Sequence, residues 1–360
     1  MRIISVTNQK GGCGKTTAAV NLSAVLAARG RRVLIIDLDP QAHATVALGL
    51  SPADCPATMY EVLRETIPIH EAIRQNHFPG LDVLPSSIPL STAEQFLSGL
   101  PGRERRLLDA LKRIPKRYDY VIVDCPPSLS LLTFNALRAA DEAIVTIDPS
   151  YLSIHGLRHL LEMIDLLRLE GRHALSLKAL LVMLDLRTKF AHELLSHLES
   201  ELKARYQTII RQTVRLREAA ACGKPVILHA PGSIGAEDFG HLADEVIAEE
   251  VSAIEECPLG KEPVQTVEGV FFWRPRGDDE EVSIAGDFNE WVPDRRVISI
   301  PDAQRTIKFV QLLPGQYRYR WVVNGVWVED VNNPNRVPSF VEGFDSVCQV
   351  EGRPEVAHVS

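Results

Sequence analysis

Eight consecutive residues near the amino terminus combine glycine, lysine and threonine at a spacing that suits the binding of a phosphate group. The stretch from Lys10 to Thr17 reads KGGCGKTT, between the apolar run 3–6 and the helix-like segment 17–28. Glycines let backbone N–H groups turn toward anionic oxygens, and the following helix adds its positive dipole end. Lys15 would add a cation at the β- and γ-phosphates, and the Thr16 hydroxyl would ligate Mg²⁺. The stretch therefore predicts a phosphate-binding loop.

Three aspartates accompany apolar, strand-like runs further along the chain. Asp37 and Asp39 lie in the run 32–41, and Asp124 lies in the run 118–127. The carboxyl ends of parallel strands meet at one edge of an open α/β sheet, which is where such sheets bind ligands. We therefore expect the three carboxylates to converge on the phosphate-binding loop. Each Asp taken singly could instead cap the helix that follows its strand.

The elements that must position these residues follow from the hydrophobic pattern. Apolar runs of strand length recur, with helix-patterned segments between most of them, at 3–6, 32–41, 81–85, 118–127, 143–147, 177–183 and 224–228. This alternation predicts an α/β fold of the P-loop NTPase type, with a doubly wound, mostly parallel sheet. We assign this domain to residues 1–255.

A second domain follows a Pro- and Gly-containing linker, which we place at residues 256–266. From residue 267 to 352 the chain has short runs rich in Val, Ile, Phe, Tyr and Trp, at 270–273, 281–286, 307–312, 317–323 and 347–350. Asn324-Gly325 between two such runs is a strong signal for a two-residue hairpin. We expect a small all-β, immunoglobulin-like sandwich here, followed by a tail at 353–360.

Size and composition limit the classes of function. The chain has 360 residues, 45% of them hydrophobic and 24% charged, which suits two domains. A net charge of −8 means that any DNA contact must be a local basic patch. Six cysteines without C-x-x-C spacing indicate reduced thiols. With no signal-peptide pattern and no apolar run near the ~20 residues that span a bilayer, we expect a cytoplasmic protein.

The loop, with its extra lysine at position 10, resembles the deviant Walker ATPases. That family includes ParA/Soj partition proteins, MinD-type cell-division regulators and nitrogenase iron proteins. Further segments are similar to successive blocks of the ParA/Soj branch, namely 37–41 (DLDPQ), 124–128 (DCPPS), 139–141 (AAD), 156–157 (GL), 187–188 (RT), 214–219 (VRLREA), 223–225 (GKP) and 235–236 (GA). The acidic segment 243–257 differs from the basic amphipathic helix of MinD-type relatives, so the resemblance implies no membrane binding.

The resemblance implies an ATPase that uses ATP and Mg²⁺ and forms an ATP-sandwich homodimer. Lys10 would reach across the dimer to the partner's nucleotide, Lys15 would bind phosphate, and Asp39 would orient the attacking water. These three are the expected catalytic residues. The expected residues on the magnesium side are Thr16, Asp37 and Asp124.

The adenine site departs from the family pattern. Relatives carry Pro and Asn in the turn before residue 214, whereas this chain has Arg211-Gln212-Thr213. Arg211 could stack on the base or point to solvent. The expected nucleotide-binding residues are Lys10, Gly11, Gly12, Cys13, Gly14, Lys15, Thr16, Thr17, Arg211 and Thr213.

One segment of the acidic chain is basic. Residues 187–224 hold eight Lys or Arg side chains against four glutamates. Arg215 matches an arginine that ParA-like dimers use on non-specific DNA, so we expect Lys203, Arg205 and Arg215 to contact DNA phosphates. The alternative is that these side chains do no more than solvate helix faces.

The second domain resembles the family 48 carbohydrate-binding modules, which include the glycogen-binding domain of AMP-activated kinase β subunits. The segments that carry this resemblance are 286–291 (GDFNEW), 313–320 (LPGQYRYR), 324–327 (NGVW) and Asp330. It implies that Trp291 and Trp327 stack on glucose rings and that Arg320 bonds sugar hydroxyls. The turn 343–345 departs from the family pattern, and the tryptophans could instead support the sandwich or a protein interface.

Together the resemblances imply a bacterial or archaeal ATPase that hydrolyses ATP slowly, binds DNA non-specifically as a dimer, and partitions or positions a plasmid, a chromosome or another cargo. A ParB-like or cargo adaptor would stimulate hydrolysis, and the ATP-bound protein would be nucleoid-associated. The alternative is a nucleotide-switched adaptor with no role in DNA segregation, whose C-terminal module binds a glycogen- or starch-type glucan or a protein.

Overall fold

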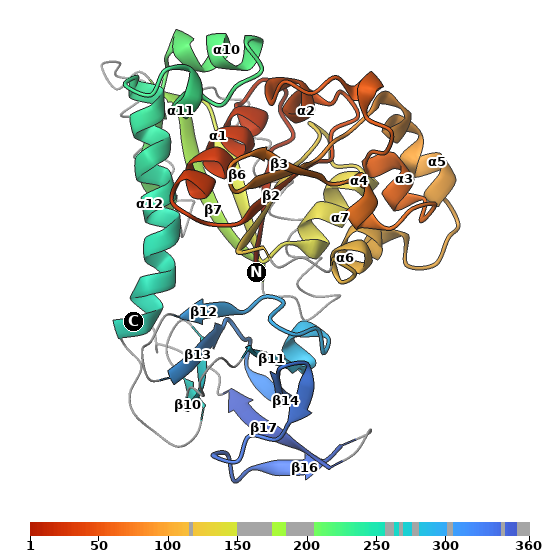
Figure 1. The fold of residues 1–360 in the computed structure, drawn as a ribbon, viewed down its shortest axis with the longest axis vertical. Coiled ribbons are helices and arrows are strands. Elements are labelled where there is room, and N and C mark those ends of the chain that lie inside the picture. The colour runs from red at the N-terminus through yellow and green to blue at the C-terminus, as the bar shows by residue number, and fades with distance from the viewer. Residues whose placement is uncertain are drawn as a thin grey trace, which may run out of the picture. The chain divides into compact units, whose positions relative to one another are not determined.

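The computed structural model describes residues 1–114, 118–149, 175–184, 205–255, 263–265, 269–275, 281–300, 305–339 and 343–350. The chain divides into two units, residues 2–246 and residues 247–360 with Met1. Figure 1 shows the mixed helix and strand unit in red to green and the strand-rich unit mainly in blue. The predicted family segments 156–157 and 187–188, and the predicted DNA contact Lys203, lie outside the described residues.

The first unit is built on an eight-stranded sheet, in the order β3-β4-β2-β5-β1-β6-β7-β8. All neighbouring strands are parallel except the pair β3 and β4, which is antiparallel. The strands are β1 (Arg2–Thr7), β2 (Val33–Asp37), β3 (Arg74–Phe78), β4 (Leu81–Leu84), β5 (Tyr120–Asp124), β6 (Glu142–Ile147), β7 (Ser176–Leu184) and β8 (Arg205–Arg211). The prediction of a doubly wound, mostly parallel sheet is confirmed.

Helices connect these strands or follow the last of them. They are α1 (Lys15–Ala28), α2 (His43–Ala47), α3 (Met59–Leu63), α4 (Ile69–Ala72), α5 (Ala93–Leu97), α6 (Arg106–Leu111), α7 (Leu131–Ala139), α10 (Val214–Ala221), α11 (Val226–His229) and α12 (Ile234–Glu255). Strands β1, β2 and β5 are buried along their whole length, which explains their near-continuous apolar sequences. No helix among the described residues is both long enough and apolar enough to cross a membrane.

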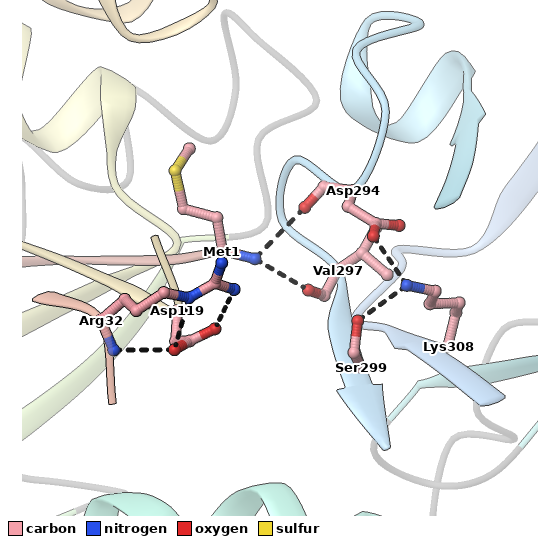
Figure 2. Close-up of polar contacts among 7 residues, drawn as sticks. All are labelled: Met1, Arg32, Asp119, Asp294, Val297, Ser299 and Lys308. Atoms are coloured by element: carbon pink, nitrogen blue, oxygen red, sulfur yellow. Dashed lines mark hydrogen bonds and ion pairs between the residues drawn. The ribbon is translucent and has the colours of Figure 1, made fainter. Parts of the chain in front are cut away.

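The register of β2 against β5 is set partly at the amino ends of the two strands. The backbone N–H of Arg32 donates to Asp119 Oδ2 at 2.8 Å, and its guanidinium donates to Oδ1 at 2.9 Å. Figure 2 shows this pair. At the opposite ends of the same strands, Asp37 lies directly beside Asp124. The sheet therefore brings together two carboxylates that are far apart in the sequence.

Three parts of the sheet unit differ from the pattern in the sequence. The apolar run 224–228 is not a strand, since residues 226–229 form α11 after Pro225, and that prediction is wrong. Pro225, the N-cap of α11, has no N–H to donate to a sheet, and the backbone N–H of Val226 donates to the side chain of Asn21 on α1. The edge strands β3 and β8 were not predicted, because polar residues interrupt both.

The second unit contains two antiparallel sheets. One has the order β12-β13-β10-β9, and the other has the order β11-β14-β17-β16 with β15 paired to β14. The strands are β9 (Val264–Gln265), β10 (Val270–Pro275), β11 (Val282–Gly286), β12 (Ile298–Ile300), β13 (Arg305–Val310), β14 (Gly315–Val323), β15 (Val326–Val328), β16 (Arg336–Pro338) and β17 (Phe344–Val350). The core contains Phe272 of one sheet and Ile284 and Trp321 of the other, so the predicted sandwich is confirmed.

Turns and buried polar groups complete the sandwich. Asn324 and Gly325 have φ values of 48° and 81°, as a tight hairpin turn between β14 and β15 requires, so this predicted hairpin is confirmed. Lys308 is buried, and its ammonium donates to Asp294 Oδ2 at 2.6 Å and to Ser299 Oγ at 2.8 Å (Figure 2). These bonds compensate for the removal of the ammonium from water.

Candidate nucleotide site

The loop between β1 and α1 has the backbone geometry of an anion-binding turn. Gly12 and Gly14 have φ values of 75° and 80°, a region that other residues rarely adopt. A Cβ atom on Gly14 would lie 3.3 Å from side-chain atoms of both Val182 and Met183 on β7, so the loop also approaches the sheet closely. Because α1 begins at Lys15, its free N–H groups and dipole face the loop.

Lys15 is directed back over the loop. Its side chain is buried, and Nζ donates to the backbone oxygen of Lys10 at 2.8 Å and lies 3.8 Å from Cys13 Sγ. The ammonium therefore lies against the loop residues Lys10 and Cys13, where it can exchange these contacts for a phosphate oxygen. Of the other predicted loop residues, Gly11 is exposed and Thr17 lies in the first turn of α1.

The predicted magnesium residues converge at the end of the loop. Thr16 Oγ1 donates to Asp124 Oδ2 at 2.8 Å, and Asp37 is the register partner of Asp124. The other carboxylate oxygen of Asp124, Oδ1, is buried and has no hydrogen-bond partner among the residues that the structure describes. A buried carboxylate oxygen without a donor fits a nearby cation or its water shell.

The burial of these carboxylates raises their pKa values. Burial raises the pKa of Asp124 well above its ordinary range, and the adjacent charge of Asp37 raises it further. Burial also raises the pKa of Asp37 to about 6, although hydrogen bonds from the hydroxyl and backbone N–H of Thr45 oppose the shift. Two adjacent buried carboxylates are unfavourable when both are ionised, so a divalent cation would stabilise this arrangement.

These side chains do not form a complete metal cage. Among the residues that the structure describes, no group of three or more His, Cys, Asp or Glu side chains is placed to hold a metal ion. Mg²⁺ keeps several waters and is commonly held by one or two carboxylates together with phosphate oxygens. The site therefore fits magnesium that arrives with a nucleotide rather than magnesium bound alone.

Asp39 lies beside this pair at the end of β2. Its side chain is buried, and Oδ1 accepts a hydrogen bond from the backbone N–H of Gln41 at 2.9 Å. Oδ2 lies 3.8 Å from Nδ1 of His43, which is largely exposed. Oδ1 is thus hydrogen-bonded within the turn, whereas Oδ2 faces the exposed imidazole of His43. The role of Asp39 in orienting water stays a prediction.

The predicted adenine residues begin α10 and end β8. Arg211 donates from Nε to both oxygens of Asp238 and from Nη2 to Asp238 and Glu237, so the edge of its guanidinium is occupied. Stacking uses the guanidinium face, which these bonds leave in place. Thr213 caps α10, and its hydroxyl accepts from the backbone N–H of Arg215 at 3.3 Å. The adenine role of both residues stays a prediction.

The described members of the predicted DNA patch lie on different elements. Arg215 is in the first turn of α10, its side chain is 57% exposed, and it is paired at 2.8 Å with Glu218. Arg205 begins β8 and donates to the backbone oxygen of Tyr206 at 3.2 Å. An exposed ion pair contributes little free energy, so its arginine can exchange Glu218 for a phosphate.

The predicted sugar residues form two groups in the second unit. The rings of Trp291 and Trp327 lie 6.1 Å apart at 45°, Trp327 is 43% exposed, and Trp291 Nε1 donates to Asp287 at 3.0 Å. Arg320 is mostly buried, and its Nε donates to the backbone oxygen of Phe344 at 3.0 Å and lies 2.9 Å from Asp345 Oδ1. The tryptophans therefore form an aromatic pair with an exposed face, whereas the guanidinium of Arg320 is engaged with the turn at 343–345.

Two supporting residues were missed in the sequence. Thr45 on α2 holds Asp37 with two hydrogen bonds, and Asn8 bridges the loop and β6 by accepting from Lys10 N and donating to Thr146 O. Thr45 lies in no motif, because the contact depends on how α2 folds back over β2. Asn8 had a usable signal, since it is a polar residue directly between a buried strand and the loop.

Comparisons with known proteins agree with this geometry. Residues 1–177 match the family described as AAA domain. The chain is 42% identical over 249 residues to the sporulation initiation inhibitor protein Soj of Bacillus subtilis, covering 69% of this chain and 98% of Soj. It is 40% identical to the chromosome partitioning protein ParA of Myxococcus xanthus, covering 68% of this chain and 88% of that protein. The chain belongs to the ParA/Soj family of P-loop ATPases.

A solved structure and a second family match extend the comparison. Cobyrinic acid a,c-diamide synthase from Mycobacterium smegmatis, with bound ADP and magnesium, is 32% identical, with a TM-score of 0.60 over 70% of this chain and 96% of that one. Residues 267–340 match the family described as the glycogen recognition site of AMP-activated protein kinase. Trp291, Arg320 and Trp327 all lie within that match.

Proposed function

We propose that the chain is a dimerising ParA-like ATPase that binds DNA non-specifically in its ATP-bound state and partitions or positions a cargo. The observation that carries the proposal is the convergence of Thr16, Asp37 and Asp124 beside the loop that Lys15 completes. Membership of the ParA/Soj family supports the same function, as does the ADP and magnesium bound to the structure from Mycobacterium smegmatis.

Each residue of the site has a separable task. The loop N–H groups and Lys15 bind the β- and γ-phosphates, whose charge Mg²⁺ offsets. Thr16 and Asp124 orient the magnesium shell, and Asp37 adds negative charge on that side. Asp39 holds the attacking water, while Lys10 contacts the partner's nucleotide.

The partners of the protein would include DNA and an adaptor protein. Arg215, Arg205 and Lys203 contact DNA phosphates in the dimer, which places the ATP-bound protein on the nucleoid of a bacterial or archaeal cell. A ParB-like or cargo-specific adaptor stimulates the slow hydrolysis and so releases the dimer. The support for this step is the family membership together with the exposure of Arg215.

Replacement of Lys15 tests the enzyme. Lys15→Ala removes the buried ammonium from the loop, so we expect steady-state ATP hydrolysis to fall by about 100-fold. Phosphate release is measured with Mg²⁺ and DNA present, and Lys112→Ala, which changes a lysine at the end of α6, serves as the control. Hydrolysis at the parent rate by Lys15→Ala would contradict the proposed site.

A second candidate function is supported by the aromatic pair of Trp291 and Trp327 and by the family match at 267–340. In this function the second unit binds a glycogen- or starch-type glucan, or a protein partner, and the nucleotide acts as a switch. The partly exposed indole of Trp327 offers an apolar face on which a sugar ring can stack.

Co-sedimentation with glycogen tests this candidate. Trp327→Ala should reduce the fraction of protein in the glycogen pellet by about fivefold or more, because it removes the exposed ring. Val326→Ala, on the same strand and also exposed, should leave the fraction unchanged. A wild-type protein that stays in the supernatant would exclude glucan binding and leave a protein partner for this surface.

A further inference from the structure

Lys10 is engaged by a carboxylate of its own chain. Its Nζ lies 2.5 Å from Oδ2 of Asp148, the residue that follows β6. The two side chains are 30% and 15% exposed, so solvent screens this ion pair less than a surface pair. In the proposed function the ammonium of Lys10 contacts the nucleotide of a partner subunit. Here it is paired with a carboxylate of its own subunit.

Other contacts fasten the loop to β6 without using this ammonium. Asn8 accepts from the backbone N–H of Lys10 at 3.0 Å and donates to the backbone oxygen of Thr146 at 2.5 Å. Cys13 Sγ lies 3.4 Å from the hydroxyl of Thr146. Since these contacts hold the loop backbone, movement of the Lys10 side chain away from Asp148 leaves the shape of the phosphate-binding loop in place.

We propose that Asp148 is a positioning residue that retains Lys10 in its own subunit and thereby opposes the association of two ATP-bound subunits. The inference rests on the proposed function, in which Lys10 contacts the partner's nucleotide. A lysine side chain that reaches the partner must first leave Asp148, and the mostly buried carboxylate then loses a favourable charge interaction. That cost lowers the affinity of the dimer.

The same contact discriminates between nucleotides. ATP presents a γ-phosphate whose charge competes with Asp148 for the ammonium, because phosphate oxygens are strong acceptors of charge-assisted hydrogen bonds. ADP lacks that group, so in an ADP-bound subunit Lys10 stays with Asp148. The ion pair would therefore keep ADP-bound subunits monomeric and set the amount of protein at which ATP-bound subunits associate.

Sedimentation of the full-length protein with Mg²⁺ and the slowly hydrolysed analogue ATPγS tests the inference. Asp148→Asn is close in shape but removes the charge, so the dissociation constant of the dimer should fall about three- to tenfold. Asp148→Glu keeps the charge and should restore the wild-type constant to within about twofold. Asp244→Asn, which removes the partner of Arg29 on α12, is the control for loss of one carboxylate and should have no effect.

Direct repulsion between Asp148 and the nucleotide would also make Asp148→Asn subunits associate more tightly. The affinity of monomers for ATPγS, measured in Lys10→Ala with and without Asp148→Asn, distinguishes the two explanations. Equal affinities support the inference, whereas tighter binding by the double variant overturns it. An Asp148→Asn dimer constant that is unchanged or higher overturns it as well.

The Lys10→Ala variant distinguishes failure of the proposed function from failure of the inference about Asp148. If Lys10→Ala associates with the wild-type constant, the proposed role of Lys10 is wrong, and the inference fails with it. If Lys10→Ala abolishes association while Asp148→Asn behaves as wild type, the proposed function stands and the inference alone is overturned.

Discussion

The candidate nucleotide site contains a few charged side chains whose burial is unfavourable when no opposite charge is near. Asp37 and Asp124 lie side by side in the sheet with raised pKa values, and Lys15 is buried over the loop. Such groups lower the stability of the empty protein and become favourable when a nucleotide and its cation supply opposite charges. Unfavourable burial of ionisable groups is common at ligand-binding sites.

The pKa of Asp37 gives a pH dependence with a definite sign. Because burial raises that pKa to about 6, lowering the pH from 7.5 to 5.5 protonates the carboxyl and removes negative charge from the magnesium side. We expect the Mg²⁺-dependent affinity for ATPγS, measured by calorimetry, to fall about three- to tenfold over this range. Asp37→Asn should bind weakly at pH 7.5 and show a flatter profile.

The stability of the nucleotide-free protein should depend on Asp37 in the opposite sense. The folded-state pKa lies above the ordinary value of 3.8, so the contribution of this group to stability is full below pH 3.8 and is lost as the pH rises through about 6. Urea unfolding of the wild type and of Asp37→Asn between pH 4.5 and 7.5 measures the contribution of Asp37 to the free energy of unfolding. A difference between the two proteins that does not change with pH would contradict it.

Among the elements, the register of β2 against β5 is what brings the two buried carboxylates together. The contact of Arg32 with Asp119 joins β2 and β5 at one end, and the same two strands carry Asp37 and Asp124 at the other. The loop, its helix and the carboxylate strands could be predicted because each has a local pattern in the sequence. Thr45 and Asp148 could not be, because their roles depend on contacts between distant segments.

Short elements show the same limit. Residues 224–228 are as apolar as a strand, yet residues 226–229 form a helix packed against Asn21 of α1. Strand β8 lies at the sheet edge and is interrupted by polar residues, and its end is fixed by the hydrogen bond from the backbone N–H of Arg211 to Asp238 of α12. Tertiary contacts rather than local preference decide both cases.

The exposed start of α10 provides a test of DNA binding. Arg215→Glu reverses a charge in each subunit of a dimer, so we expect ATP-dependent DNA affinity to fall about tenfold or more and its salt dependence to weaken. Retention on a DNA-coated surface at two salt concentrations measures both. Arg336→Glu is a matched control, since Arg336 is equally exposed at 58% and is also paired with a glutamate. Equal retention of the two variants would remove Arg215 from the DNA contact.

At the scale of the whole molecule, an ATPase of the ParA/Soj family is joined to a β-sandwich that matches a glycogen recognition site. The curated relatives Soj and ParA are covered almost completely by about two thirds of this chain, so the sandwich lies outside that similarity. Its strands and hairpin could be predicted from alternating hydrophobicity. The engagement of Arg320 with Asp345 could not, because it joins β14 to β17.

Light scattering of the Asp39→Ala protein with ATP and Mg²⁺ measures directly whether ATP joins two subunits. Loss of the carboxylate proposed to orient water should trap the ATP-bound state, so we expect a particle of about twice the chain mass of 40.0 kDa. With ADP, or with Lys10→Ala added, the particle should return to the mass of one chain. A single-chain mass for Asp39→Ala in the presence of ATP and Mg²⁺ would contradict the claim that ATP joins two subunits.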